Sequence, residues 1–109
     1  MLDAQHCLEC LEACIECKIM CLKMGNNECA KCCEVCADAC KLCLTIHNFC
    51  HDKKLKKMAC SICYKLCKDC SDECDKHSME CCKKCSRHCK KCMQNIKNKN
   101  HHRLTSKKH

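Results

Sequence analysis

The sequence predicts an all-α protein, an antiparallel up-down-up-down four-helix bundle with a cysteine-lined core. Three observations lead to this fold class. Cysteine accounts for 22 of the 109 residues and recurs in alternating steps of three and four, which is the period of one helix face. Glycine occurs once and proline not at all, although sheets and loop-rich scaffolds need turn residues at frequent intervals. With one Phe, one Tyr and no Trp, an ordinary apolar core is out of reach, so cysteine must fill much of the interior.

The first two helices are expected where the first two cysteine series run. Gly25 suits a left-handed C-cap after the first helix, and Asn27 suits the N-cap of the second. The first series comprises Cys7, Cys10, Cys14, Cys17 and Cys21. The second series comprises Cys29, Cys33, Cys36, Cys40, Cys43, His47 and Cys50, with Cys32 beside it.

The third and fourth helices follow from the remaining series. Asp52 is the expected N-cap of the third helix, and Ser78 can cap the fourth. The third series comprises Cys60, Cys63, Cys67, Cys70 and Cys74, and His77 and Cys81 continue its register. The fourth comprises Cys82, Cys85, Cys89 and Cys92. Short connections favour antiparallel neighbours, so the four cysteine columns should meet along the bundle axis.

An apolar column, one residue out of phase with the cysteines, accompanies each of the first three series. Neighbouring positions on a helix lie about 100° apart, so we expect cysteines and aliphatic residues to share one broad buried face. The fourth series has lysines in place of this column, so it should be the most exposed helix or one that covers apolar surface with its lysine stems. The apolar columns are Leu8, Leu11, Ile15, Ile19 and Leu22; Val35, Ala39, Leu42, Ile46 and Phe49; and Leu55, Ala59, Ile62 and Leu66.

The domain organisation predicted from composition is a cysteine-rich bundle over residues 1–95 and a basic, His/Lys-rich flexible tail over residues 96–109. The tail carries five of the basic residues and no acid. No aromatic residue is interleaved with these charges, which favours a solvated tail over a nucleic-acid interface. No targeting signal and no run of about 18 apolar residues is visible, so we expect a cytoplasmic protein without a membrane partner.

Four roles for the cysteines compete. Buried cysteine can act as a small hydrophobe, but that role does not require 22 of them in register. Disulfides within a helix are disfavoured because Cβ atoms three or four residues apart are too distant, and a reducing cytosol does not call for bridges between helices. Zinc sites and iron–sulfur clusters usually take their cysteines from loops, whereas each C-x-x-C here lies inside a helix.

Cu(I) is the metal that the pattern favours, because a soft monovalent ion suits thiolates and accepts few ligands. Ionising all 22 thiols would take the formal charge from +8 to −14, and one Cu⁺ for each thiolate would restore it to +8. Zn²⁺ held by four thiolates leaves each site at −2, and a column of such sites would repel itself.

The four cysteine stripes also resemble the bacterial copper storage proteins. The stripes are CLECLEACIECKIMC (7–21), CCEVCADACKLC (32–43), CSICYKLCKDCSDEC (60–74) and CCKKCSRHCKKC (81–92). The resemblance covers residues 5–95 and implies a four-helix bundle whose lumen is lined with cysteine. It further implies cytosolic storage of many Cu(I) ions per chain by the leaderless branch, in a homo-oligomer that is commonly a tetramer.

Histidine and methionine are expected at both ends of the bundle. His6, His47, His51, Met58 and Met93 should gather at one end. Met20, Met24, His77 and Met79 should gather at the other. We expect Met20 and Met93 to plug the core. His47 and His77 occupy cysteine-column positions, so we expect them to be copper ligands together with all 22 cysteines.

The predicted function is therefore Cu(I) storage and sequestration without catalysis, since an enzyme needs one activated thiol beside a base rather than many equivalent ones. Two alternatives stay open on the residues alone. One is a zinc or cadmium thiolate sink of metallothionein type on a helical frame, and the other is a redox-responsive interaction protein with labile disulfides between helices.

Overall fold

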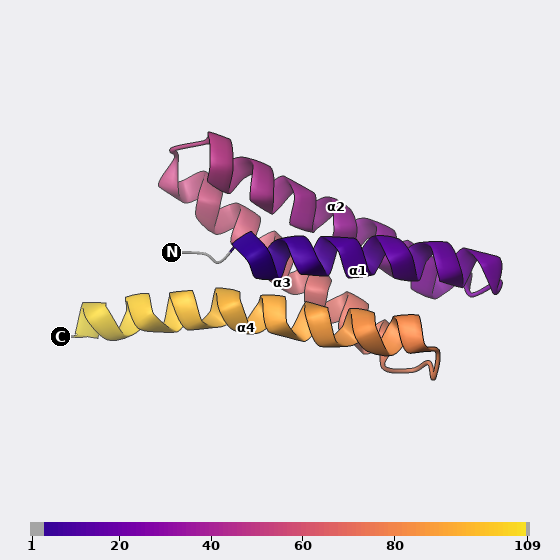
Figure 1. Cartoon of the computed structure of the whole chain (residues 1–109). Coiled ribbons are helices and arrows are strands. Elements are labelled where there is room, and N and C mark those ends of the chain that lie inside the picture. Colours follow the sequence, from indigo (N-terminus) through magenta and orange to yellow (C-terminus); the bar gives the residue numbers. More distant parts are fainter. Residues whose placement is uncertain (1–3, 109) are drawn as a thin grey trace.

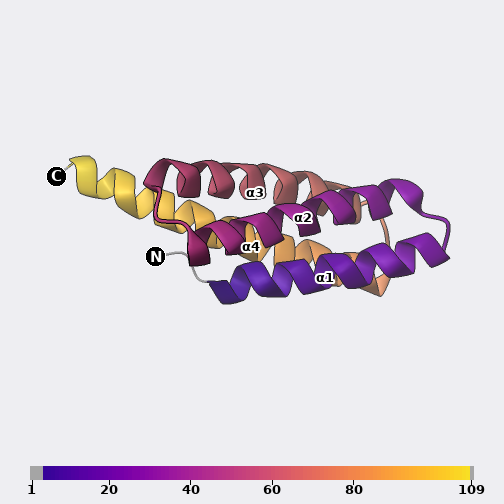
Figure 2. The same ribbon diagram turned by 90° about the horizontal axis from the view of Figure 1, so that it is seen from above.

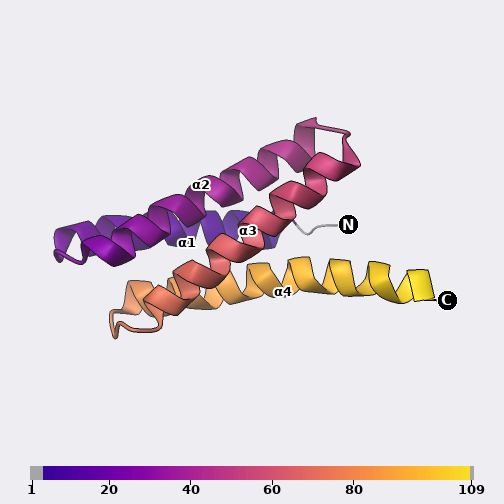
Figure 3. The ribbon, with the colours of Figure 1, turned by 180° about the vertical axis from the view of Figure 1, so that it is seen from behind.

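The computed structural model describes residues 4–108, with the side chains of residues 4–98, as four α-helices in a bundle. The helices are α1 (Ala4–Lys23), α2 (Asn27–Phe49), α3 (Lys53–Cys74) and α4 (Glu80–Lys108). Each helix packs against the next, and α4 closes the ring by packing against α1. Seen from behind, α3 crosses from the end of α2 to the start of α4 (Figure 3). The predicted all-α, four-helix class is confirmed, and no strand occurs within residues 4–108.

The connections between helices define the two ends of the bundle. The start of α1, the α2–α3 connection and the end of α4 lie at one end, which we call the α2–α3 end (Figure 1). The α1–α2 and α3–α4 connections lie at the opposite end. Viewed from above, α4 projects past the α2–α3 connection (Figure 2). This arrangement makes neighbouring helices antiparallel, as the short connections led us to expect.

The helix boundaries follow local chemistry. Gly25 has φ of 78° and ends α1 in the left-handed conformation, as predicted. The Asp52 carboxylate accepts hydrogen bonds from the backbone N–H groups of Lys54 and Leu55, which confirms it as the N-cap of α3. The N-cap of α2 is Asn26 rather than the predicted Asn27, and Asn26 makes no side-chain cap bond. The fourth helix begins at Glu80, so Ser78 lies outside the capping position predicted for it.

The core consists of cysteine sulfur. Nineteen of the 22 cysteines are buried, and the other three are partly exposed. The buried residues beside this column are small: they are Ala13, Ala30, Ala37, Ala39, Ala59, Ser71 and Ser86. Ile46 and Ile96 are the large aliphatic residues among the buried side chains of residues 4–98. Small flanking residues let the helix axes approach one another, so sulfur atoms from all four helices meet at the centre.

The prediction that the aliphatic columns share the buried face is wrong for most of their members. Ile19 is 46% exposed, Val35 48% and Phe49 79%. The remaining exposed members are Leu8, Ile15, Leu22, Leu42, Leu55 and Ile62. A step of about 100° from the cysteine column carries these side chains out of a bundle whose lumen is only wide enough for thiols.

The fourth helix runs through residues 96–108 without interruption and buries Ile96 at 1% exposure. The division between a bundle and a flexible tail at residue 95 therefore stays a prediction. The side chains of residues 99–109, including the three tail histidines, lie outside the described range. Among the described helices, none combines the length and the apolar character needed to cross a membrane.

Candidate metal centre

A column of sulfur atoms runs along the bundle axis. From α1 to α4, Sγ atoms approach to 3.6 Å between Cys14 and Cys85 and to 3.7 Å between Cys17 and Cys82. The paired cysteines follow one another in opposite order along α1 and α4, because these two helices are antiparallel. Diagonal helices also meet, with 3.8 Å between the sulfurs of Cys29 on α2 and Cys82 on α4. Sulfur atoms therefore occupy the axis of the bundle.

The sulfurs assemble into groups that draw one cysteine from each helix. Within a group, all four Sγ atoms lie within 4.8 Å of one another, and every member is buried. Five such groups are Cys7–Cys40–Cys63–Cys92, Cys10–Cys40–Cys67–Cys92, Cys10–Cys36–Cys67–Cys89, Cys14–Cys36–Cys70–Cys89 and Cys17–Cys33–Cys74–Cys85. Four convergent thiols are a ligand set for a soft or borderline metal ion.

Neighbouring groups share members. Cys40 and Cys92 belong to the first two groups, and Cys36 and Cys89 belong to both the third and the fourth. A thiolate in two groups would have to bridge two metal ions if both groups were filled. The sulfurs therefore form a nearly continuous polymetallic site instead of a set of separate four-ligand sites.

The spacing of the sulfurs suits metal–thiolate geometry. Close Sγ–Sγ pairs lie 3.6 to 4.0 Å apart, and the extremes are Cys14–Cys85 and Cys63–Cys67. With a metal–sulfur bond of about 2.3 Å, three sulfurs around one ion stand about 4.0 Å apart and two in line stand about 4.6 Å apart. Three-sulfur coordination needs almost no rearrangement, whereas two-sulfur coordination requires the pair to separate by less than about 1 Å. Both are accessible to small shifts of thiol rotamers.

The thiols differ in acidity. Burial raises the pKa of Cys29 to about 12 and that of Cys81 to about 11, and it also raises the pKa of Cys21. Thiol hydrogen bonds, first from Cys33 and then from Cys74, lower the pKa of Cys17 to about 6. Thiols with a raised pKa keep their protons in the metal-free lumen, and a metal ion that binds there must displace them.

Three cysteines lie at the margin of the column. Cys32, Cys50 and Cys81 are partly exposed but still pack against the core. Cys50 is the C-cap residue of α2, just beyond its last helical residue. Cys81 belongs to α4 and not to the third series to which its spacing assigned it, because α3 ends at Cys74. No disulfide joins any of the 22 cysteines, all of which lie in the described range.

The two predicted histidine ligands lie in different surroundings. The Nε2 atom of His47 lies 3.5 Å from the Cys60 sulfur, and its Nδ1 atom lies 3.7 Å from the Cys43 sulfur and 2.9 Å from the Cys43 carbonyl oxygen. His47 thus joins the column at the α2–α3 end. His77 lies beyond the end of α3, with its Nε2 atom 2.9 Å from a carboxylate oxygen of Glu73. That contact leaves Nδ1 of His77 as the nitrogen for a copper ion, with the carboxylate on the other side of the ring.

Some of the methionines pack against the core and others are exposed. Met79 and Met93 pack against the sulfur core, as expected for Met93. Met20 is 42% exposed and does not plug the core, contrary to the expectation for it. Met24 and Met58 are also exposed, at the two ends of the bundle.

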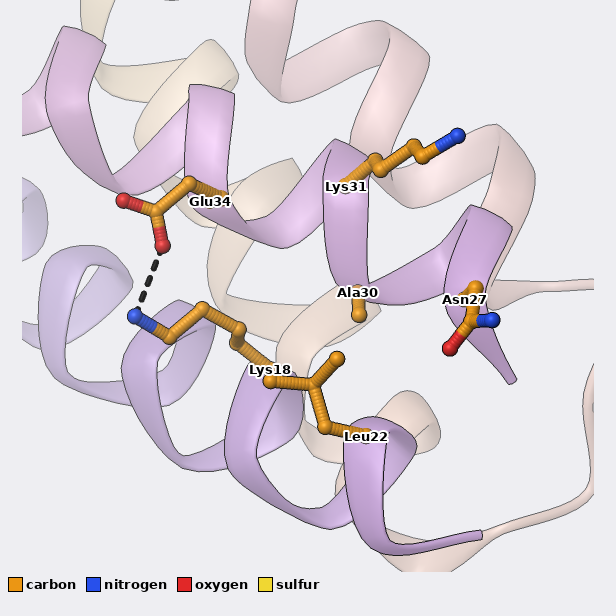
Figure 4. Close-up of a pocket in the computed structure, with 6 residues that line it drawn as sticks. All are labelled: Lys18, Leu22, Asn27, Ala30, Lys31 and Glu34. Atoms are coloured by element: carbon orange, nitrogen blue, oxygen red, sulfur yellow. Dashed lines mark ion pairs between the residues drawn. The ribbon is translucent and has the colours of Figure 1, made fainter. Parts of the chain in front are cut away.

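A hollow on the outside of the bundle is separate from the sulfur column. It lies between α1 and α2, has a volume of about 350 Å³ and is crossed by an ion pair of 2.7 Å between Lys18 and Glu34 (Figure 4). Its lining residues are Lys18, Leu22, Asn27, Ala30, Lys31 and Glu34, none of which is a cysteine or histidine. This hollow therefore offers no thiol or imidazole ligand to a metal ion.

A four-helix bundle with a lumen of buried, convergent thiols defines a polymetallic thiolate protein. The chain belongs to the copper storage protein family, whose sequence model matches residues 3–101. It is similar to a solved structure described as Cu(I)-bound copper storage protein BsCsp3, with 27% identity and a TM-score of 0.79. That match covers 87% of this chain and 92% of the other. No curated protein matches the sequence. The resemblance noted from the four stripes is confirmed, and copper storage is favoured over the zinc and redox alternatives.

Proposed function

We propose that the chain stores many Cu(I) ions as one extended thiolate cluster along the bundle axis. The observation that carries this proposal is the sharing of cysteines between successive four-sulfur groups. Shared thiolates bridge metal ions, and bridging suits Cu(I), which accepts two or three sulfurs and leaves each thiolate able to hold a second ion. Zn²⁺ in isolated tetrahedral sites would instead need four thiolates for each ion.

The charge balance supports the same ion. Thiolates without counter-ions in this lumen would concentrate negative charge where water is excluded, which is prohibitively unfavourable. One Cu⁺ for each of the 22 thiolates neutralises the cluster and returns the chain to its formal charge of +8. Four-thiolate Zn²⁺ sites would each retain a charge of −2, and their repulsion would grow with every site filled.

The proposed ligands are the 22 cysteines and His47, with the column cysteines as the main store. Cys32, Cys50 and Cys81 lie at its margin and would bind the last ions. His47 would add an imidazole nitrogen beside Cys43 and Cys60. His77, predicted from its register, would bind through Nδ1, since its Nε2 atom contacts Glu73.

A metal titration tests the proposal. The reduced protein is titrated anaerobically with Cu(I) against a competing chelator of known affinity, and separately with Zn²⁺. The expected result is tight uptake of well over ten Cu(I) per chain, approaching about one per cysteine. Saturation of either metal at about five or six ions, the number that four-thiolate sites allow, would contradict Cu(I) storage and support a zinc sink.

The cellular setting and assembly complete the proposal. A lumen of free thiols is compatible with the reducing cytoplasm, where we place the protein. We further propose a non-catalytic homotetramer. The exposed aliphatic stripe of α1, formed by Leu8, Ile15, Ile19 and Leu22, supports self-association because such surfaces are usually buried in assemblies.

A further inference from the structure

The α2–α3 end carries a surface that storage inside the bundle does not explain. We call it the basic tip, and it consists of residue 49 and residues 53–58. Phe49 is 79% exposed and Met58 is 60% exposed. Four lysines, Lys53, Lys54, Lys56 and Lys57, lie between these apolar residues in the sequence, in the first turns of α3. Exposed aromatic and methionine side chains within a charged rim are typical of protein interfaces.

The positive charge of the basic tip is not neutralised by its neighbours. Among residues 4–98, none of these four lysines belongs to an ion pair that the structure contains. The nearest acid in the chain, Asp52, already accepts two backbone N–H groups of α3. The five basic residues after Asn95, of which Lys97 is the first, belong to the part of α4 that runs toward the same end.

The lysines do not serve the helix in which they lie. Lys53 and Lys54 occupy the first turn of α3, which has no acidic residue. The N-terminus of a helix carries partial positive charge, so cations there are unfavourable for the helix itself. The stability of α3 therefore does not account for lysines at these positions.

The basic tip lies at the end of the bundle where the sulfur column has partly exposed members. His47 is partly exposed, lies two residues before Phe49 and contacts the sulfur atoms of Cys43 and Cys60. Cys50, also partly exposed, directly follows Phe49. The opposite end differs, because Glu28, Asp72, Glu73, Asp75 and Glu80 intersperse acids among its lysines.

We propose that the basic tip docks an acidic protein that carries Cu(I) on exposed thiolates. The inference rests on the proposed storage function. Phe49 and Met58 would provide the apolar contacts, and the lysines would provide charge complementarity and faster association. Copper stays Cu(I) in the transfer: each ion exchanges the partner's thiolates for thiolates of this chain, and the displaced thiol protons pass to the partner's thiolates or to water.

The experiment uses two synthetic peptides in place of the partner. Each is a dansyl-labelled Cys-x-x-Cys peptide loaded with Cu(I), flanked either by four glutamates or by four lysines. Anaerobic stopped-flow fluorescence follows copper loss to the full chain. The acidic peptide should deliver copper at least about tenfold faster at low ionic strength, and high salt should remove most of that difference.

Two variants that lose the same charge at different places test whether the preference for the acidic peptide depends on the basic tip. Substituting the four tip lysines by glutamine should abolish most of the preference for the acidic peptide. Substituting Lys23, Lys31, Lys83 and Arg87 by glutamine removes the same charge elsewhere and should retain the preference within about twofold. Equal losses in both variants, or no loss in the tip variant, would overturn the docking proposal. The tip variant should melt no lower than the unmodified chain, since the replaced lysines oppose the α3 dipole.

Two further measurements distinguish failure of the docking proposal from failure of the storage function and from binding to a lipid surface. Equilibrium uptake of Cu(I) from a small chelator is measured on the same samples, and low capacity there would defeat the storage function rather than the docking surface. Co-sedimentation with phosphatidylcholine vesicles containing phosphatidylserine tests a lipid partner. Vesicle binding that the tip substitutions abolish, together with no preference between the peptides, would overturn the protein partner in favour of a membrane surface.

Discussion

The sulfur atoms of Cys10 on α1 and Cys67 on α3 lie 3.8 Å apart, although these helices are diagonal members of the bundle. Side chains as short as cysteine bridge that diagonal only because alanine and serine flank the column and allow a narrow lumen. Most side chains buried in this lumen are therefore cysteine, alanine or serine, and Ile46 and Ile96 are the large aliphatic exceptions among residues 4–98.

Removing one central thiol should lower the copper capacity by a small and definite amount. Cys67 lies within 4.0 Å of the sulfurs of Cys10, Cys36 and Cys63, so Cys67→Ala should remove about one Cu(I) site while the helices remain folded. Chelator competition and circular dichroism measure both quantities. Ser71→Ala, a buried control on the same helix, should leave the capacity unchanged. Loss of half the capacity in Cys67→Ala would contradict a distributed cluster.

Copper loading should release protons in a pH-dependent way. Cys29 and Cys81, with pKa values raised to about 12 and 11, are protonated at pH 7 and must lose their protons to bind as thiolates. Hydrogen bonds, first from Cys14 and then from Cys33, lower the pKa of Cys70 to about 6, and Cys17 has a similar value, so these two release few protons at pH 7. Release per ion should therefore rise between pH 7 and pH 5.5, and uptake should weaken as the pH falls. Indicator dyes in weak buffer report the count, and proton release that is independent of pH would refute this assignment.

The N-cap of α3 should contribute measurably to apo-protein stability. Asp52→Ala removes the acceptor for two backbone N–H groups and should lower the free energy of unfolding by about 1 kcal/mol. Asn26 is the matched control, because it occupies the N-cap of α2 without a side-chain bond, and Asn26→Ala should cost much less. Urea denaturation of the reduced protein gives both values. Equal losses of unfolding free energy in the two variants would show that the hydrogen bonds of Asp52 do not stabilise the protein.

The aliphatic stripe of α1 should hold the proposed assembly together. Light scattering should give the unmodified chain a mass of four times 12.6 kDa. The double substitution Ile15→Lys and Ile19→Lys should weaken association by at least about tenfold, since it places charge on apolar contact surface. Ile62→Lys is an exposed aliphatic control on α3. A monomeric unmodified chain, or an unchanged double variant, would argue against assembly through α1.

The sequence predicts the helices and the sulfur column well because one strong period governs both. Steps of three and four place Cys10, Cys14 and Cys17 on one helix face, and the structure buries all three. Gly25 and Asp52 mark boundaries correctly because a positive φ and an N-cap each require particular chemistry.

The cysteine period does not predict how wide the buried face of a helix is, or at which residue a helix ends. It places Val35 and Ile19 beside the cysteines but does not say how much of each helix face the lumen covers, and both are about half exposed. It extends the third series through His77, although α3 ends at Cys74 and the imidazole turns to Glu73. Asn26 and Asn27 are the same residue type, so residue identity alone does not select the cap.

The shared membership of the sulfur groups has a kinetic consequence. The group Cys10–Cys36–Cys67–Cys89 shares Cys36 and Cys89 with the group that contains Cys14 and Cys70. A Cu(I) ion bound to two or three of these sulfurs can keep a shared thiolate while it exchanges the others. Ions admitted at one end of the bundle can therefore pass between neighbouring groups along the axis by short displacements, without full release at each step.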